Sequence, residues 1–182
     1  MNKNLFIGLF SLLILPKISY SANIYTPYVG IDGLYNKAKT MSRHTEYGGL
    51  NLNVGTSYND YFGTEIFYQS TFPRHFYLDN MKYKTSYRAY GLDLYAYTPS
   101  LKGLKLTASL GAATYVLKQK KSGLSSSSDE GHGYRFGAGF IYDVNRHISL
   151  RVMARFINFD HISNMDHMSE YSVGLRYNFT KE

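Results

Sequence analysis

The sequence predicts an all-β fold, an eight-stranded antiparallel up-and-down transmembrane β-barrel. Apolar and polar residues alternate with a period of two in segment after segment, and no window of useful length has helical spacing. Glycine and charge gather on one face of these segments, and short connections alternate with long ones. The 182 residues suffice for one domain, and a mean hydropathy of −0.30 excludes a helical membrane protein. With 19 Tyr and 11 Phe, the chain also has too much ring surface for a disordered polymer.

The amino terminus predicts export. Its apolar run from Leu5 to Leu15 follows Lys3 and is too short for a membrane helix, which needs about 20 residues. Small residues at Ser19 and Ser21 then predict a signal peptide over residues 1–21, cut after Ser21. The barrel domain would occupy residues 22–182 of the chain and begin at Ala22.

The first four predicted strands are residues 28–36, 50–58, 62–72 and 91–97. Their apolar face carries Val29, Ile31, Tyr35, Leu52, Val54, Ile66, Tyr68, Leu92, Leu94 and Ala96. The opposite face carries small, amide and acidic residues. Each segment is near the roughly 9–11 residues with which a tilted strand crosses a bilayer.

The last four predicted strands are residues 104–111, 134–143, 148–156 and 170–179, and their alternation is the clearest in the chain. The final strand sets Tyr171, Val173, Leu175, Tyr177 and Phe179 against Glu170, Ser172, Gly174, Arg176 and Asn178. Apolar rings near strand ends, among them Tyr134 and Tyr142, are typical of the aromatic girdles of membrane barrels.

The face that carries charge also carries most strand glycines, so we assign it to the lumen. Eight strands enclose a lumen that side chains just fill, which favours small residues inside. The predicted lumenal polar network consists of Asp32, Glu65, Asp93, Arg135, Arg151, Arg155, Glu170 and Arg176. Charges in so narrow an interior must pair, because an unpaired one is costly. Structural pairing is therefore favoured over an ion path.

The connections predict the compartment. Residues 59–60, 98–103 and 144–146 form short turns, whereas residues 37–45, 73–82, 120–132 and 161–167 form longer polar loops. Short turns at one end and long loops at the other are typical of a bacterial outer-membrane barrel, with turns in the periplasm and loops outside.

Three segments carry a family resemblance: residues 28–32 (YVGID), 61–68 (YFGTEIFY) and 171–179 (YSVGLRYNF). With them the sequence resembles the small outer-membrane β-barrel family that includes opacity-type surface proteins and the membrane domain of OmpA-like proteins. The resemblance implies a fold and only a range of functions, including adhesins and structural barrels. The chain departs from the family by the tail Thr180-Lys181-Glu182 after the final aromatic residue.

Basic residues in or near the long connections form a predicted outer basic rim. Its members are Lys37, Lys39, Arg43, Arg74, Lys82, Lys120 and Lys121. They can balance the anionic outer leaflet, bind lipopolysaccharide phosphates or bind polyanionic host surface molecules. Five of the six histidines, His44, His75, His132, His161 and His167, also fall in these connections, but none has the spacing of a metal site. We predict no cofactor, no metal and no nucleic-acid partner.

One short motif points to chemistry. His161, Ser163 and Asn164, followed by Glu170, are similar to the His-x-Ser-Asn motif of lipid A deacylases. That resemblance implies Ser163 as nucleophile, His161 as its base, Glu170 as the orienting acid and Asn164 in the oxyanion site. Continued alternation places His161, Ser163 and Glu170 on the lumenal face, away from lipid, and the spacing to Glu170 is short.

The leading hypothesis is a non-enzymatic outer-membrane surface barrel whose exposed loops serve adhesion, surface contact or envelope integrity. The alternative is a lipid A 3-O-deacylase that uses Ser163. A small pore is a weaker alternative, because the predicted lumen is filled.

Overall fold

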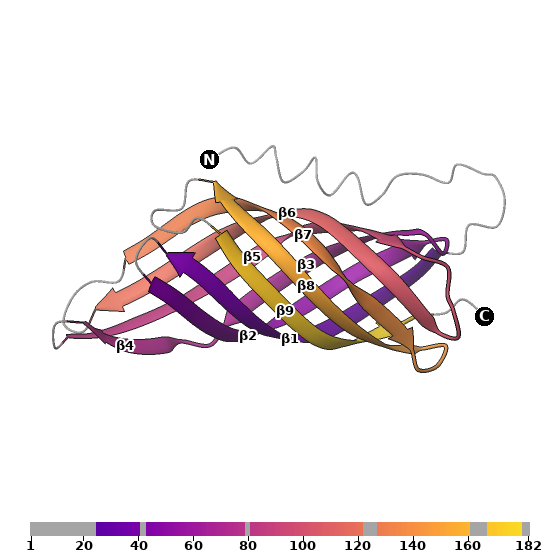
Figure 1. Cartoon of the computed structure of the whole chain (residues 1–182), viewed down its shortest axis with the longest axis horizontal. Helices are drawn as coiled ribbons and strands as arrows, with labels where there is room; N and C mark the ends of the chain where they lie inside the picture. The colour runs from indigo at the N-terminus through magenta and orange to yellow at the C-terminus, as the bar shows by residue number, and fades with distance from the viewer. Residues whose placement is uncertain (1–24, 41–42, 79–80, 122–126, 161–166, 180–182) are drawn as a thin grey trace.

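The computed structural model describes residues 25–40, 43–78, 81–121, 127–160 and 167–179, and within them nine antiparallel strands. The strands are β1 (Tyr25–Thr40), β2 (Arg43–Tyr58), β3 (Phe62–Thr71), β4 (Arg74–Leu78), β5 (Met81–Tyr97), β6 (Leu104–Lys121), β7 (Ser127–Asp143), β8 (Ile148–Asp160) and β9 (His167–Asn178). Eight of them pair in the order β3-β2-β1-β9-β8-β7-β6-β5, and pairing of β3 with β5 closes the ring (Figure 1). The predicted eight-stranded barrel is confirmed. No helix in the described residues is long and apolar enough to cross a membrane.

The ninth strand, β4, continues the line of β3 along β5 (Figure 1). Pro73 lies between β3 and β4 and has no N–H to donate to the ladder. At this interruption the Thr71 hydroxyl accepts a hydrogen bond from the Tyr87 N–H at 2.8 Å and donates one to the Tyr87 carbonyl at 3.0 Å. A side chain thus bridges the ladder where the backbone of β3 leaves it.

The strands extend further at one end of the barrel than expected. We call this the loop end, where β1–β2, β4–β5, β6–β7 and β8–β9 connect, and the opposite end, with residues 59–61, 98–103 and 144–147, the turn end. The predicted loops over residues 37–45 and 120–132 were too long, because β1 runs to Thr40, β2 begins at Arg43 and β7 begins at Ser127. Their outward residues are polar like a loop, but their inward residues, such as Ala38 and Tyr47, stay buried. His44, His75, His132 and His167 therefore lie in strands, and His161 lies outside the described residues.

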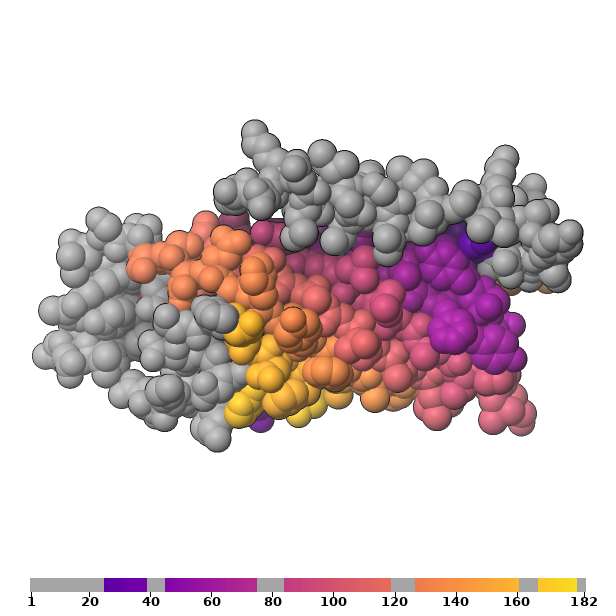
Figure 2. Space-filling view, turned by 90° about the horizontal axis from the view of Figure 1, so that it is seen from above, coloured from indigo at the N-terminus to yellow at the C-terminus, as the bar shows by residue number. Residues whose placement is uncertain are grey.

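The outer wall is apolar between the two ends, and segments distant in sequence lie side by side on it (Figure 2). Tyr134, Tyr142, Tyr171, Tyr177 and Phe179 point outward as predicted and are about half exposed. Not every tyrosine faces outward, however. Tyr28, Tyr47, Tyr87, Tyr95, Tyr97 and Tyr115 are buried.

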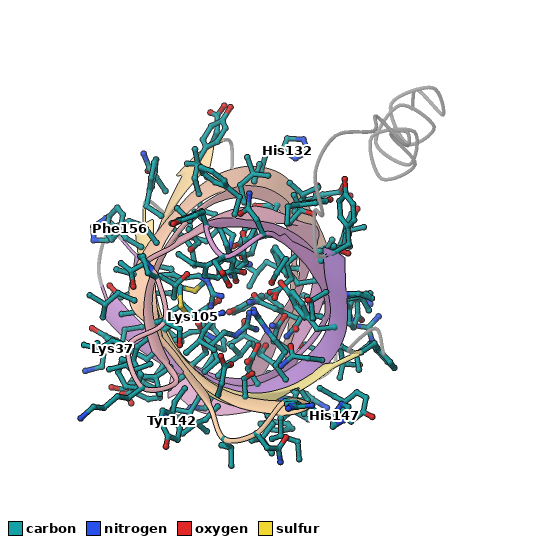
Figure 3. All side chains as sticks on the ribbon, turned by 90° about the vertical axis from the view of Figure 1, so that its right-hand side faces the viewer. Lys37, Lys105, His132, Tyr142, His147 and Phe156 are labelled. Atoms are coloured by element: carbon teal, nitrogen blue, oxygen red, sulfur yellow. The ribbon has the colours of Figure 1, made fainter. Side chains whose placement is uncertain are left out.

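Side chains project into the lumen from around the barrel wall (Figure 3). A cluster of buried rings and aliphatic side chains that includes Phe67, Tyr87, Tyr115 and Ile157 occupies the loop-end half. A smaller cluster contains Tyr95, Tyr97, Ile141 and Met153. The predicted signal peptide, residues 1–21, and the tail after Phe179 lie outside the described residues.

Candidate functional site

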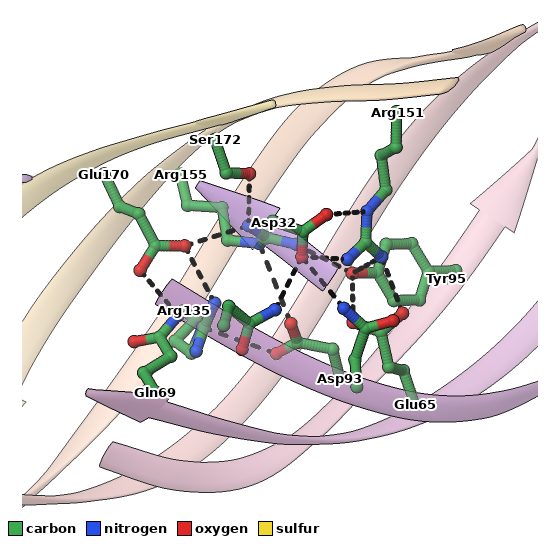
Figure 4. Close-up of polar contacts among 12 residues, drawn as sticks. Asp32, Glu65, Gln69, Asp93, Tyr95, Arg135, Arg151, Arg155, Glu170 and Ser172 are labelled. Carbon is green, nitrogen blue, oxygen red and sulfur yellow. Dashed lines mark hydrogen bonds and ion pairs between the residues drawn. The ribbon is translucent and has the colours of Figure 1, made fainter. Parts of the chain in front are cut away.

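The lumen contains a buried ion network. Its eight charged residues are the eight that the alternation assigns to the lumen, and each is at most 4% exposed: Asp32, Glu65, Asp93, Arg135, Arg151, Arg155, Glu170 and Arg176. They come from β1, β3, β5, β7, β8 and β9 and converge in the middle of the barrel (Figure 4). Four carboxylates face four guanidinium groups, so the network is formally neutral.

The Glu65 cluster, which we define as Asp32, Glu65, Arg151 and Arg176, is closely hydrogen-bonded. Arg151 contacts both carboxylate oxygens of Asp32 and donates to the Glu65 carboxylate at 2.6 Å. Arg176 reaches the same Glu65 oxygen at 3.3 Å, and its guanidinium lies 3.7 Å from the centroid of the Tyr28 ring. Arginine is suited to this position because its planar fork can engage two acids at once.

Two amides complete the shell of Asp32. The Asn51 and Asn53 side-chain N–H groups donate to its carboxylate at 2.6 Å and 2.9 Å. Both asparagines lie on β2, beside Asp32 on β1. Such bonds to a charged acceptor offset part of the cost of removing the carboxylate from water.

The Glu170 cluster, which we define as Asp93, Arg135, Arg155 and Glu170, is less evenly bonded. Arg155 and Arg135 reach one Glu170 oxygen at 2.8 Å and 3.0 Å, and the Gln69 amide donates to the other at 2.8 Å. Asp93 instead lies 3.5 Å from Arg135 Nε and 3.7 Å from Arg155 Nε. Neither Asp93 oxygen accepts a hydrogen bond from the described residues.

The Tyr95 hydroxyl joins the two clusters (Figure 4). It accepts hydrogen bonds from Arg155 at 2.8 Å and from Arg151 at 3.2 Å, and it donates to Glu65 at 3.2 Å. Tyr95 is on β5, and the two arginines lie on one face of β8, four residues apart. One hydroxyl therefore couples the two halves of the network.

Glycines provide the space that these side chains occupy. In the strand pairings, Gly174 lies opposite both Asp32 and Arg151, and Gly111 lies opposite both Asp93 and Arg135. A Cβ atom built at Gly111 would come within 2.0 Å of an Asp93 carboxylate oxygen, and one at Gly174 within 2.1 Å of an Asp32 oxygen. Glycine at these positions is required by close approach rather than by backbone torsion.

The network acts chemically as a plug. Each of its acids forms an ion pair with at least one arginine, although the Asp93 oxygens accept no hydrogen bond from the described residues. The predicted network contained charged residues only and left out its neutral members: Asn51, Asn53, Gln69, Tyr95 and Ser172. Each lies on the same alternating face as the charges, so the alternation that identified the charges also contained the signal for them.

The predicted outer basic rim lies at the loop end, on strand extensions. Arg74 donates from Nε to the Glu46 carbonyl at 2.9 Å and lies 3.7 Å from the Glu46 carboxylate. Lys37 opposes Glu46 in the β1–β2 register. For the other members the structure gives only strand positions: Lys39, Arg43, Lys82, Lys120 and Lys121, on β1, β2, β5 and β6. The rim is therefore divided between β1–β2, where an acid is present, and β5–β6.

The predicted deacylase motif is only partly described. His161, Ser163 and Asn164 lie outside the described residues. Glu170 is fully buried in the lumen, where Arg135, Arg155 and Gln69 engage its carboxylate. Across the described ranges, no group of three or more His, Asp or Glu side chains is arranged to hold a metal ion.

Comparison with known proteins agrees with this architecture. A family model described as outer membrane protein beta-barrel domain matches residues 9–179. No curated protein matches the sequence. Neisserial surface protein A, NspA, superposes with a TM-score of 0.72 at 16% identity, covering 84% of this chain and 97% of that one.

Two further solved structures have the same fold. Ail, the attachment invasion locus protein of Yersinia pestis, in complex with the heparin analogue sucrose octasulfate, has a TM-score of 0.64 at 15% identity, covering 86% of this chain and 99% of that one. The N-terminal β-barrel domain of Pseudomonas aeruginosa OprF has a TM-score of 0.54 at 17% identity, covering 84% and 97%. At such identities the likeness extends to the fold alone.

Proposed function

Because the chain belongs to the family of outer membrane protein beta-barrel domains, we propose that it is a non-catalytic surface barrel that binds polyanions at its loop end. Barrels of the bacterial outer membrane carry short turns in the periplasm and longer connections outside the cell. The loop end therefore faces the exterior. Adhesion, surface contact and envelope integrity are the roles that this placement serves.

The filled lumen supports a binding role over transport or catalysis. The Glu65 and Glu170 clusters lie across the middle of the barrel, and their acids and arginines form ion pairs with one another. Opening a path would separate buried ion pairs, which costs several kcal/mol for each uncompensated charge. What the chain offers to other molecules is therefore its outer surface.

The observation that carries the proposal is a concentration of like charge on β5 and β6. Lys84 opposes Lys120 in the register, and Lys118 opposes Ser86 two pairs further toward the membrane. Like charges directly opposite each other destabilise a sheet. Lys84, Arg88 and Lys118 are exposed and make no ion pair with any acid of the described residues.

In the described register, no acid lies directly opposite Lys84 or Lys118. The register places His75 beside Lys84 on one side and Ser128 beside Lys118 on the other. Asp129, opposite the buried Leu117, is half-buried, and the first exposed acid in the register is Glu130, opposite Val116. An anionic partner that neutralises this repulsion would explain why the surface tolerates it, and the sulfate or phosphate groups of a saccharide carry the required charge. Ail, which shares the fold, was solved with a sulfated saccharide.

The test measures binding of sucrose octasulfate to the full chain in detergent micelles by calorimetry. We expect Lys84→Gln with Lys118→Gln to weaken binding by about tenfold or more, because two charge-assisted contacts are lost. Lys102→Gln with Arg146→Gln removes the same charge at the turn end and should leave binding unchanged. Affinity should also fall steeply as salt is added.

Two results would contradict the proposal. If both double variants bind sucrose octasulfate with equal affinity, the binding site does not lie on β5 and β6. Release of acyl chains from lipid A by the parent, lost in Ser163→Ala, would establish the enzyme alternative in place of a non-catalytic barrel.

A further inference from the structure

The outer wall carries an apolar groove away from the charged residues Lys84 and Lys118 of β5 and β6. It has a volume of about 660 Å³ and crosses β2, β1, β9, β8 and β7. Its floor is made of small outward residues, Gly33, Gly48, Ala138 and Ala154, and rings such as Tyr35 and Phe140 form its sides. Ala138 and Ala154 are direct cross-strand partners.

The fold does not require glycine in this floor. A Cβ atom at Gly33 would meet its nearest neighbour, the Val173 carbonyl oxygen, at 3.7 Å, and one at Gly48 would meet the Phe72 ring at 3.6 Å. Both are ordinary contacts, unlike the 2.0 Å approach at Gly111 inside the lumen. Glycine also weakens a strand interior. The missing side chains at 33 and 48 therefore create space on the membrane side without relieving any clash.

The loop-end side of the groove is positively charged. Lys37 follows Tyr35 on the outward face, and its ammonium lies 5.6 Å from the centroid of the Tyr35 ring. Arg74 follows Phe72 closely in sequence and is about half exposed. Glu46 forms an ion pair with Arg74 and lies opposite Lys37 in the strand register. With one carboxylate for two cations, this corner has an excess of one positive charge.

We propose that the groove binds an acyl chain of a phosphorylated glycolipid, lipid A, with a headgroup phosphate at Lys37 and Arg74. The groove is continuous with the apolar wall that meets lipid, and its charged corner lies at the loop end, where outer-leaflet headgroups begin. Lysine and arginine bind phosphate through charge-assisted hydrogen bonds. An apolar groove that ends at two cations is complementary to an acyl chain attached to an anionic headgroup.

The test titrates lipid A against the full chain in detergent micelles and measures the lipid-bound fraction by native mass spectrometry, with dioleoyl phosphatidylcholine as the net-neutral comparison. Ala138→Leu with Ala154→Leu fills the floor. Ala96→Leu with Ala108→Leu is the matched control, because these alanines are also exposed cross-strand partners but lie on β5 and β6 outside the groove. Circular dichroism verifies that both variants remain barrels.

We expect Ala138→Leu with Ala154→Leu to weaken lipid A binding by about tenfold, because the acyl chain loses contact for roughly two methylene groups. The control variant should bind lipid A like the parent. Lys37→Gln with Arg74→Gln should reduce the preference for lipid A over phosphatidylcholine. Equal binding by the two alanine variants would overturn the proposal. A parent dimer that the filled groove converts to a monomer would also overturn it, because a second copy would then be the occupant.

Discussion

Asp32 and Asp93 are equally buried in the same lumen, but they differ in the hydrogen bonds that their carboxylates accept. Each is 1% exposed. Asp32 is held by Arg151 and by the amides of Asn51 and Asn53, whereas Asp93 has two ion pairs at 3.5 Å and 3.7 Å and no hydrogen bond from the described residues. A buried carboxylate is tolerated when hydrogen bonds replace its water shell, so burial alone does not measure what a charge contributes.

The difference originates in the strand register. Asp32 lies between Asn51 on β2 and Gly174 on β9, so one neighbour donates a bond and the other leaves room. Asp93 lies between Glu65 on β3 and Gly111 on β6, so its cross-strand neighbour is another acid. Like charges side by side repel, and the two acids turn to different arginines.

The largest expected effect tests this contrast directly. We expect Asp32→Ala to lower the free energy of unfolding by about 3–5 kcal/mol, because Arg151 and two amides lose a shared acceptor. Asp93→Ala should cost less than about half of that, because the Asp93 oxygens accept no hydrogen bond from the described residues and their removal leaves no donor newly unpaired. Urea unfolding of both variants in lipid vesicles measures the two values. Equal losses would mean that hydrogen bonding does not distinguish the sites.

A smaller effect should follow from separating the two clusters. Tyr95→Phe removes the hydroxyl that Arg151, Arg155 and Glu65 share, and we expect a loss of about 1–3 kcal/mol in the free energy of unfolding. Tyr97→Phe is the matched control. Its ring stacks on Tyr95 at 5.9 Å, but its hydroxyl has no hydrogen-bond partner in the described residues. A similar loss in both variants would assign the effect to ring packing instead.

The facing of the strands could be predicted from sequence, and the pairing of the charges could not. A period of two assigns each residue to the lumen or the wall, so Asp32, Asp93 and Arg151 were placed on one face by alternation alone. Which acid meets which arginine depends on the stagger between strands far apart in sequence. Arg151 on β8 reaches Asp32 on β1 and Glu65 on β3 across the lumen, contacts that no local pattern encodes.

The strand ends were mispredicted for a related physical reason. Beyond the membrane the outward face of a strand meets water, so its sequence becomes polar like that of a loop. Lys37 and Glu46 have this character, yet the strands continue because Ala38 and Tyr47 still face the buried interior. The tyrosines of the loop-end half had no predicted facing, because they lie outside the predicted strands and an apolar ring fits both a lipid-facing wall and a packed lumen.

The smallest effect concerns a single contact within the Glu170 cluster. Arg155 Nη1 donates to the Ser172 hydroxyl at 3.2 Å and to Glu170 at 2.8 Å, so Ser172→Ala removes the weaker of two acceptors. We expect a loss of about 0.5–1 kcal/mol by urea unfolding, the net value of one hydrogen bond whose donor keeps a partner. Ser109→Ala is the control, because the Ser109 hydroxyl is buried without a hydrogen-bond partner in the described residues. If Ser172→Ala costs as much as Tyr95→Phe, then Arg155 is positioned by its contact with β9 as much as by the Tyr95 link to the Glu65 cluster.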